Sequence, residues 1–119
     1  MQDEWELDIS LASKSAFSKF QKNHGREYVS CFNNLNKIIG LLKDGQSPIK
    51  LNHNPGFFVS EGKGVYRIGQ TGVVGAKETR LYVYPSEQDK VIYILSIGTK
   101  ESQRVDINEA HKVVKAIKK

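Results

Sequence analysis

Hydrophobic and polar residues alternate near the start of the chain. In EWELDI, at residues 4–9, acidic side chains alternate with Trp5, Leu7 and Ile9. A period of two is typical of a strand with one buried face. The sequence therefore predicts a short strand close to the N-terminus.

Two consecutive helices are predicted next. Residues 13–24 have a helical composition, and we expect Gly25 to end this helix as a left-handed C-terminal cap. Residues 26–43 have a stronger pattern, because apolar residues recur at spacings of three and four and share one helical face. These apolar residues are Tyr28, Phe32, Leu35, Ile39 and Leu42. Gly45 is expected to close the second helix, which completes a helical hairpin.

The rest of the pattern predicts a loop, three strands and a helix. Residues 44–64 contain Pro48 and Pro55 and are expected to form a long loop. The three strands are GVYRIG (64–69), TRLYVY (79–84) and VIYILSI (91–97), the last two being antiparallel neighbours. VIYILSI is almost entirely apolar and β-branched, so it should be central, with both faces covered.

The last predicted element is a helix that begins at Asp106. Glu109 follows three residues later, as in a capping box, and an apolar stripe continues from there. The stripe consists of Ile107, Ala110, Val114 and Ile117. The order β-α-α-β-β-β-α predicts an α+β fold, with helices packed on an antiparallel sheet.

Length and composition indicate one globular domain, residues 1–119. The chain is 39% hydrophobic and 26% charged, which is ordinary for a folded domain. A single cysteine, Cys31, excludes an intramolecular disulfide and is expected to pack in the core. The acidic N-terminus is unlike a signal peptide, and no apolar run approaches the roughly 20 residues of a membrane helix. We therefore expect a cytoplasmic protein that has no membrane partner.

The chain is basic, and its charge is uneven. Eighteen Lys and Arg residues against 13 Asp and Glu give a net charge of +5. Residues 61–119 carry eleven basic and seven acidic side chains, whereas residues 1–60 carry seven and six. Such an excess suggests an anionic partner, most commonly nucleic acid, although it can also serve only solubility.

Several kinds of chemistry have no support in the sequence. There is no Walker motif and no zinc-ligand spacing, and Arg67 stands where a dinucleotide fingerprint needs its third glycine. The histidines, His24, His53 and His111, are scattered through different predicted elements. We expect no cofactor and no metal.

Basic side chains on the predicted strands are the remaining signal. Arg67 lies in the middle of one strand, Arg80 begins the next, and Lys100 follows the third. Residues on one face of neighbouring strands lie roughly 5–8 Å apart, so these cations can form a cluster that suits phosphate. The alternative interpretation is an exposed strand face that carries cations for solubility.

The order of elements, together with GVYRIG, TRLYVY and VIYILSIGTKESQRVDINEAHKVV, resembles the RelE/ParE superfamily of bacterial toxins. The resemblance extends over residues 4–118, through short motifs. It implies an N-terminal strand, a helical hairpin, a curved antiparallel sheet and a C-terminal helix.

For function, the resemblance implies the toxin of a type II toxin–antitoxin pair, a metal-independent endoribonuclease that cleaves mRNA on the ribosome. Its partners would be that mRNA and a cognate antitoxin. Arg67, Arg80 and Lys100 match the family's basic positions. RNA contacts are expected at Lys63, Arg104, Lys112 and Lys115.

The sequence departs from the family at two positions. Gly69 stands where a second basic residue is common, and Asp106 falls near the expected tyrosine. As a helix cap, Asp106 would be a poor general acid. The near-neutral pKa of histidine makes His53 the preferred acid–base candidate, ahead of Tyr66, Tyr82 and Lys63.

Two further functions stay open. One is a non-catalytic protein of the same fold that binds nucleic acid or a protein target such as gyrase. The other is a small interaction domain with no nucleic-acid partner. Salt-sensitive binding to polyanions would distinguish them.

Overall fold

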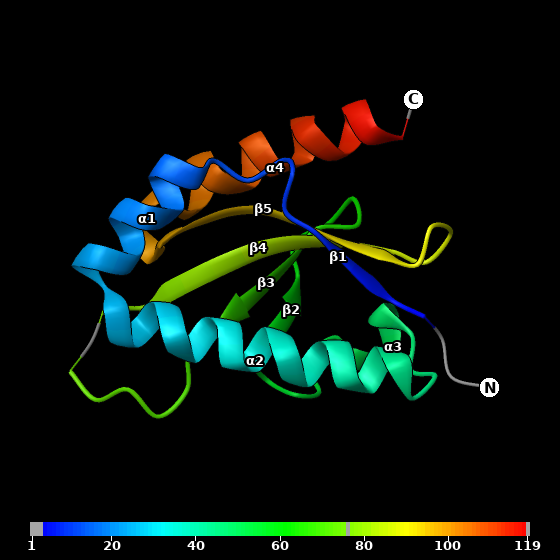
Figure 1. Cartoon of the computed structure of the whole chain (residues 1–119), viewed down its shortest axis with the longest axis horizontal. Helices are drawn as coiled ribbons and strands as arrows, with labels where there is room; N and C mark the ends of the chain where they lie inside the picture. Colours follow the sequence, from blue (N-terminus) through cyan, green and yellow to red (C-terminus); the bar gives the residue numbers. More distant parts are fainter. Residues whose placement is uncertain (1–3, 76, 119) are drawn as a thin grey trace.

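The structure is a computed structural model of the chain, and it describes residues 4–75 and 77–118 (Figure 1). Its strands are β1 (Glu6–Asp8), β2 (Phe58–Ser60), β3 (Tyr66–Gly69), β4 (Thr79–Ser86) and β5 (Val91–Thr99). Its helices are α1 (Lys14–Asn23), α2 (Gly25–Lys43), α3 (Pro48–Leu51) and α4 (Gln103–Ile117), with a 3-10 turn, η1, at Lys100–Ser102. The predicted α+β class is confirmed.

The five strands form one mixed sheet in the order β1-β5-β4-β3-β2. The prediction of a fully antiparallel sheet is wrong at one edge, because β1 pairs with β5 in parallel. The other three pairings are antiparallel, including that of β4 with β5. An alternating pattern marks a strand but carries no information on its direction, so the sequence could not show the parallel edge.

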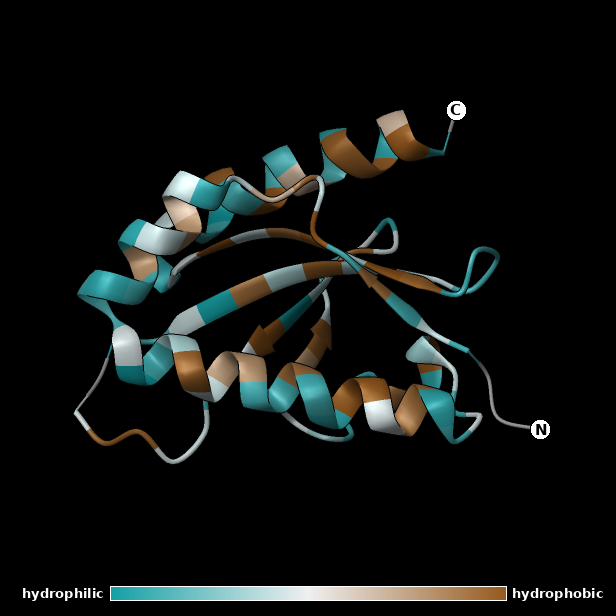
Figure 2. Cartoon of the chain, viewed as in Figure 1, coloured by the Kyte–Doolittle hydropathy of each residue, from teal (hydrophilic) through white to brown (hydrophobic). Residues whose placement is uncertain are grey.

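Helices cover both faces of the sheet, with α2 on one side and α4 on the other (Figure 1). The buried apolar residues of α2, Cys31, Leu35, Ile38 and Leu42, belong to the core against the sheet. Apolar and polar residues alternate along α2 in the hydropathy colouring (Figure 2). Ile92 and Ile94 of β5 belong to the larger core beneath α1 and α2, whereas Leu95 packs with Ala110 and Val114 of α4. Both faces of β5 are covered, as predicted, but β5 is the second strand of the sheet, and the middle strand is β4.

The helical hairpin forms, but its turn differs from the prediction. Gly25 is the first residue of α2 rather than a C-terminal cap, and His24, with φ −137° and ψ 53°, makes the break. The end of α2 is as predicted. Gly45 adopts a φ of 99°, its N–H donates to Leu42 O, and the next N–H, from Gln46, donates to Leu41 O. This pair of bonds is a Schellman motif.

Residues 44–64 contain more structure than the predicted loop. Pro48 starts the short helix α3, in the first turn where a missing N–H costs nothing. The edge strand β2 follows at Phe58–Ser60 and pairs with β3. At three residues, β2 is too short for a sequence period to show.

The C-terminal helix begins before the predicted Asp106, at Gln103, directly after η1. Asp106 is therefore in the first turn and is not the N-cap, and its carboxylate accepts a hydrogen bond from Ser102 Oγ at 2.6 Å. The buried positions Ala110 and Val114 belong to the predicted stripe. Within the described residues, no helix combines the length and apolar character needed to cross a membrane.

Candidate functional site

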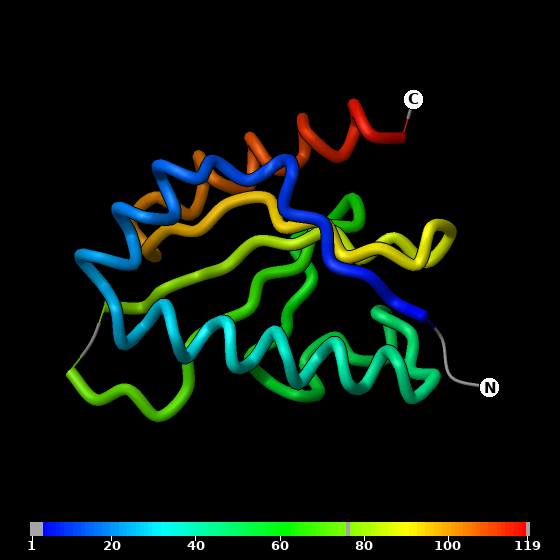
Figure 3. The backbone as a smooth tube through the Cα atoms, in the orientation of Figure 1, coloured from blue at the N-terminus to red at the C-terminus, as the bar shows by residue number. Residues whose placement is uncertain are grey.

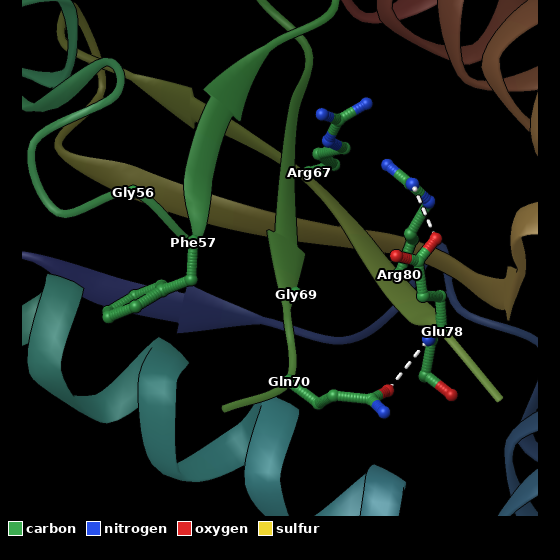
Figure 4. Close-up of a pocket in the computed structure, with 8 residues that line it drawn as sticks. Gly56, Phe57, Arg67, Gly69, Gln70, Glu78 and Arg80 are labelled. Atoms are coloured by element: carbon green, nitrogen blue, oxygen red, sulfur yellow. Dashed lines mark hydrogen bonds and ion pairs between the residues drawn. The ribbon is translucent and has the colours of Figure 1, made fainter. Parts of the chain in front are cut away.

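Arg67 and Arg80 project from neighbouring strands on the same side of the sheet (Figure 4). The register of β3 and β4 sets Arg67 opposite Tyr82 and Gly69 opposite Arg80. Residues opposite each other share a face, and so do residues two apart on a strand. Tyr82 packs in the core beneath α4, so both arginines lie on the α4 side of the sheet.

A pocket of about 190 Å³ opens beside the two arginines, the arginine pocket. It is lined by Gly56, Phe57, Arg67, Gly69, Gln70, Glu78, Thr79 and Arg80. A Cβ on Gly69, across from Arg80, would have Phe57 O and Thr79 O 4.0 Å away, so the missing side chain leaves space there. The wall of the pocket is fixed by Gln70, whose Oε1 accepts a hydrogen bond from Thr79 N at 2.7 Å (Figure 4).

Each arginine of the pocket is paired with a carboxylate. Arg67 Nη1 lies 3.4 Å from Glu61 Oε2, which also accepts a hydrogen bond from Gln103 Nε2 at 3.3 Å. Arg80 Nη2 lies 3.4 Å from Glu78 Oε2. Both guanidinium groups are therefore partly neutralised, and an incoming phosphate would compete with these internal anions.

Lys100 lies at the edge of this cluster and does not line the arginine pocket. Its Nζ is 3.7 Å from Glu78 Oε2, so one carboxylate holds both Lys100 and Arg80. The predicted convergence of positions 67, 80 and 100 is thus met by the two arginines, with Lys100 attached through Glu78. The side chain of Lys100 is 69% exposed.

A layer of buried polar atoms lies on the same face of the sheet. Tyr82 Oη, Ser96 Oγ and Arg80 Nε are buried and have no hydrogen-bond partner within the described part of the chain. Ser96 is the cross-strand partner of Tyr82, which places their side chains side by side. Burial raises the pKa of the Tyr82 hydroxyl, with a smaller contribution from the charge of Asp106. The hydroxyl therefore stays protonated at neutral pH.

Asp106 closes the other end of this polar layer. A Cβ on Gly98, the cross-strand partner of Arg80, would collide with Asp106 Oδ2 and Ser102 Oγ. The glycine thus lets the carboxylate approach the sheet. Burial raises the pKa of Asp106 above its ordinary value, and the hydrogen bond from Ser102 opposes that shift only in part. Asp106 is hydrogen-bonded, as expected, but it is not the helix cap that the sequence predicted.

The other predicted acid–base residues lie apart from the arginine pocket. His53 is exposed in the turn between α3 and β2, with a φ of 65°, and does not line the pocket. Tyr66 stacks on Phe58 in the opposite core, with ring centroids 4.5 Å apart. Of the predicted candidates on the strands, Tyr82 is on the same face as the arginines, and Lys63 lines the groove beside α4 that is described below.

The predicted RNA-contact residues fall into two groups. Lys63 and Lys115 line a second groove, described below. Arg104 and Lys112 are exposed on α4, and Lys112 Nζ pairs with Glu109 Oε1 at 3.4 Å. Sequence reasoning missed the two glutamates of the arginine pairs, Glu61 and Glu78. Glu78 lies directly before β4, two residues ahead of Arg80, and this closeness in the sequence was the available signal.

No family model matches the sequence, and no curated protein matches it. Across residues 4–75 and 77–118, no three His, Cys, Asp or Glu side chains gather as metal ligands would.

Proposed function

We propose that this chain is the toxin of a type II toxin–antitoxin pair, of the RelE/ParE kind, and that it cleaves mRNA on the ribosome. The observation that carries the proposal is the convergence of Arg67 and Arg80 on one open pocket. Two guanidinium groups side by side suit a phosphodiester, since each can donate two parallel hydrogen bonds to phosphate oxygens.

The proposed reaction is an internal transfer at phosphorus. The 2′-oxygen of one nucleotide forms a bond to the adjacent phosphorus while the bond from phosphorus to the next 5′-oxygen breaks. The 2′-hydroxyl gives up a proton, the leaving 5′-oxygen takes one up, and the products carry a 2′,3′-cyclic phosphate and a 5′-hydroxyl. Arg67 and Arg80 would stabilise the negative charge that grows on the non-bridging oxygens.

For the proton transfers, Asp106 replaces His53 as the preferred candidate. Its raised pKa brings the carboxyl group closer to neutral pH, where an acid–base group is most effective. It lies beside Gly98, whose cross-strand partner is Arg80, whereas His53 is exposed in a separate turn. Tyr82 has a second, neutral hydroxyl on this face, which is buried and does not line the arginine pocket.

The antitoxin is proposed to lay an extended or helical segment over the basic surface. Acidic side chains of such a segment would compete with RNA for Arg67 and Arg80, as Glu61 and Glu78 already do within the chain.

A second candidate function is non-catalytic binding of nucleic acid or of a protein target such as gyrase. The observation that favours it is that the two arginines are already paired with carboxylates, while no histidine lines the arginine pocket. Such a site can hold a phosphate without supplying a proton carrier.

The test is expression in bacteria of the wild-type chain and two double variants. Arg67→Gln with Arg80→Gln removes the pocket charges, and Lys14→Gln with Lys19→Gln removes equal charge from exposed positions on α1. The proposal expects growth arrest and cut mRNA with the wild type and the α1 variant only. Intact mRNA with the wild-type chain contradicts it, and salt-sensitive RNA binding without cleavage selects the non-catalytic function.

A further inference from the structure

A second groove, the α4 groove, lies between the β2–β3 turn and the C-terminal half of α4. It is lined by Lys63 of the turn, by His111, Val114 and Lys115 of α4, and by Lys118 directly after α4, with a volume of about 440 Å³. The backbone trace shows the turn, in green, reaching toward the orange and red helix (Figure 3). Residues far apart in the sequence thus line one basic groove.

The turn is fastened to the helix. His111 Nε2 lies 2.9 Å from Glu61 O, so the two are hydrogen-bonded. Gly64, with a φ of 87°, passes so close to Tyr84 that a Cβ would press on its ring. Lys118 Nζ lies 5.5 Å from the centre of the same ring. The walls of the α4 groove are therefore held in place without a ligand.

The charges of the α4 groove are not compensated. Lys63, Lys115 and Lys118 have no carboxylate within ion-pair distance among the residues that the structure describes, whereas Arg67 and Arg80 each have one. Val114 forms an apolar floor and is buried. Uncompensated cations in a groove with a low-dielectric floor concentrate positive potential there.

We infer that the α4 groove is a second anion-binding site, which takes the phosphodiester backbone of single-stranded RNA beyond the nucleotide bound at the arginine pocket. This inference rests on the proposed function in taking RNA as the ligand. Glu61 adjoins both sites, since its carboxylate pairs with Arg67 and its carbonyl bonds His111. A strand that leaves the arginines along α4 therefore meets Lys63, Lys115 and Lys118 next.

Binding of a 2′-O-methyl RNA octamer tests the inference, because this RNA has no 2′-hydroxyl to attack and stays intact whether or not the protein is a nuclease. The variant is Lys63→Gln with Lys115→Gln; both residues are exposed, and Gln keeps most of each side chain. The control of equal charge is Lys14→Gln with Lys19→Gln. A dinucleotide, too short to occupy both sites, is measured in parallel.

We expect the groove variant to bind the octamer more weakly. The plot of log K against log salt should become shallower by roughly 1.4 in slope, for two lost phosphate contacts. Dinucleotide binding should be unchanged. Equal losses of octamer binding in the groove and control variants would overturn the inference. Binding of an acidic peptide is measured as well, and a groove variant that loses the peptide but keeps the octamer would also overturn it. If the proposed nuclease function is wrong, that shows separately, because mRNA on the ribosome stays intact when the wild-type chain is expressed.

Discussion

Glu61 Oε2 lies 3.4 Å from Arg67 Nη1, so a carboxylate of the chain occupies one of the two guanidinium groups of the arginine pocket. The glutamate side chain is 12% exposed and is also held by Gln103. An RNA phosphate must therefore displace Glu61 or share Arg67 with it. The pair acts as an internal competitor of the proposed ligand.

Replacing Glu61 with Gln should strengthen RNA binding. The amide keeps the size of the side chain and the bond from Gln103 while it removes the competing charge. Partly exposed ion pairs contribute up to about 1 kcal/mol, so we expect a gain of at most about fivefold in affinity and a similarly small loss of stability. Titration of a labelled 2′-O-methyl RNA measures the change. Weaker binding by E61Q would show that Glu61 positions Arg67 rather than competes for it.

Replacing Tyr82 with Phe should separate activity from stability. The hydroxyl is buried without a partner among the described residues, so its loss leaves no broken hydrogen bond. We expect the free energy of unfolding to change by less than about 1 kcal/mol, or to rise. A fall in cleavage would show that RNA reaches this buried hydroxyl. A large loss of stability, measured by urea denaturation, would instead reveal a structural hydrogen bond to the hydroxyl.

Replacing Asp106 with Asn should change how stability depends on pH. The pKa of Asp106 is raised in the folded state, so the folded protein holds this proton more tightly than the unfolded chain. The contribution of this proton to the free energy of unfolding is fully present below pH 3.8, the ordinary pKa of an aspartate. It is lost as the pH rises through the pKa that Asp106 has in the folded state. We expect D106N to flatten this fall, because an amide does not ionise and its oxygen can still accept from Ser102.

The same variant tests catalysis. If Asp106 transfers protons, D106N lowers the cleavage rate and removes the corresponding limb from the pH–rate profile. The control is Asn in place of Asp89, an exposed carboxyl between β4 and β5. A D106N enzyme with the wild-type rate and pH profile would restrict Asp106 to a structural role.

Cys31 should be unreactive in the folded protein. It is fully buried on α2, and burial, aided by the charge of Glu27, raises its pKa to about 12. Because the thiolate is the reactive form, we expect iodoacetamide to label the thiol only when the chain unfolds. Ser18→Cys in a Cys31→Ala background, on the exposed side of α1, should react at once. Rapid labelling of native Cys31 would contradict the packing of α2 against the sheet.

Local signals in the sequence predicted most of the fold. The helical period and Gly45 located α2 and its end, because amphipathic faces and left-handed glycines act within a few residues. The break at His24 is local but falls one residue before the glycine that was expected to make it, and β2 is too short for a sequence period to show. The parallel pairing of β1 with β5 depends on contacts between distant segments. No pattern within ten residues carries that information.

The candidate site was predictable only in part, for the same reason. Arg67 and Arg80 lie on adjacent predicted strands, so strand alternation could bring them together once the register was known. Glu61 comes from a turn, and its partner Gln103 from the first turn of a helix that begins earlier than the capping pattern indicated. His53 was preferred for its pKa alone, and pKa says nothing about position.

The central claim is that Arg67 and Arg80 together bind phosphate in one pocket. Its most direct test is the salt dependence of binding of the 2′-O-methyl RNA octamer to the wild type, to R67Q/R80Q and to the charge-matched K14Q/K19Q. We predict that R67Q/R80Q weakens binding and makes the fall of log K with log salt shallower by roughly 1.4 in slope. For K14Q/K19Q, the affinity and the slope should stay near those of the wild type. The same slope and affinity for all three proteins would contradict the claim.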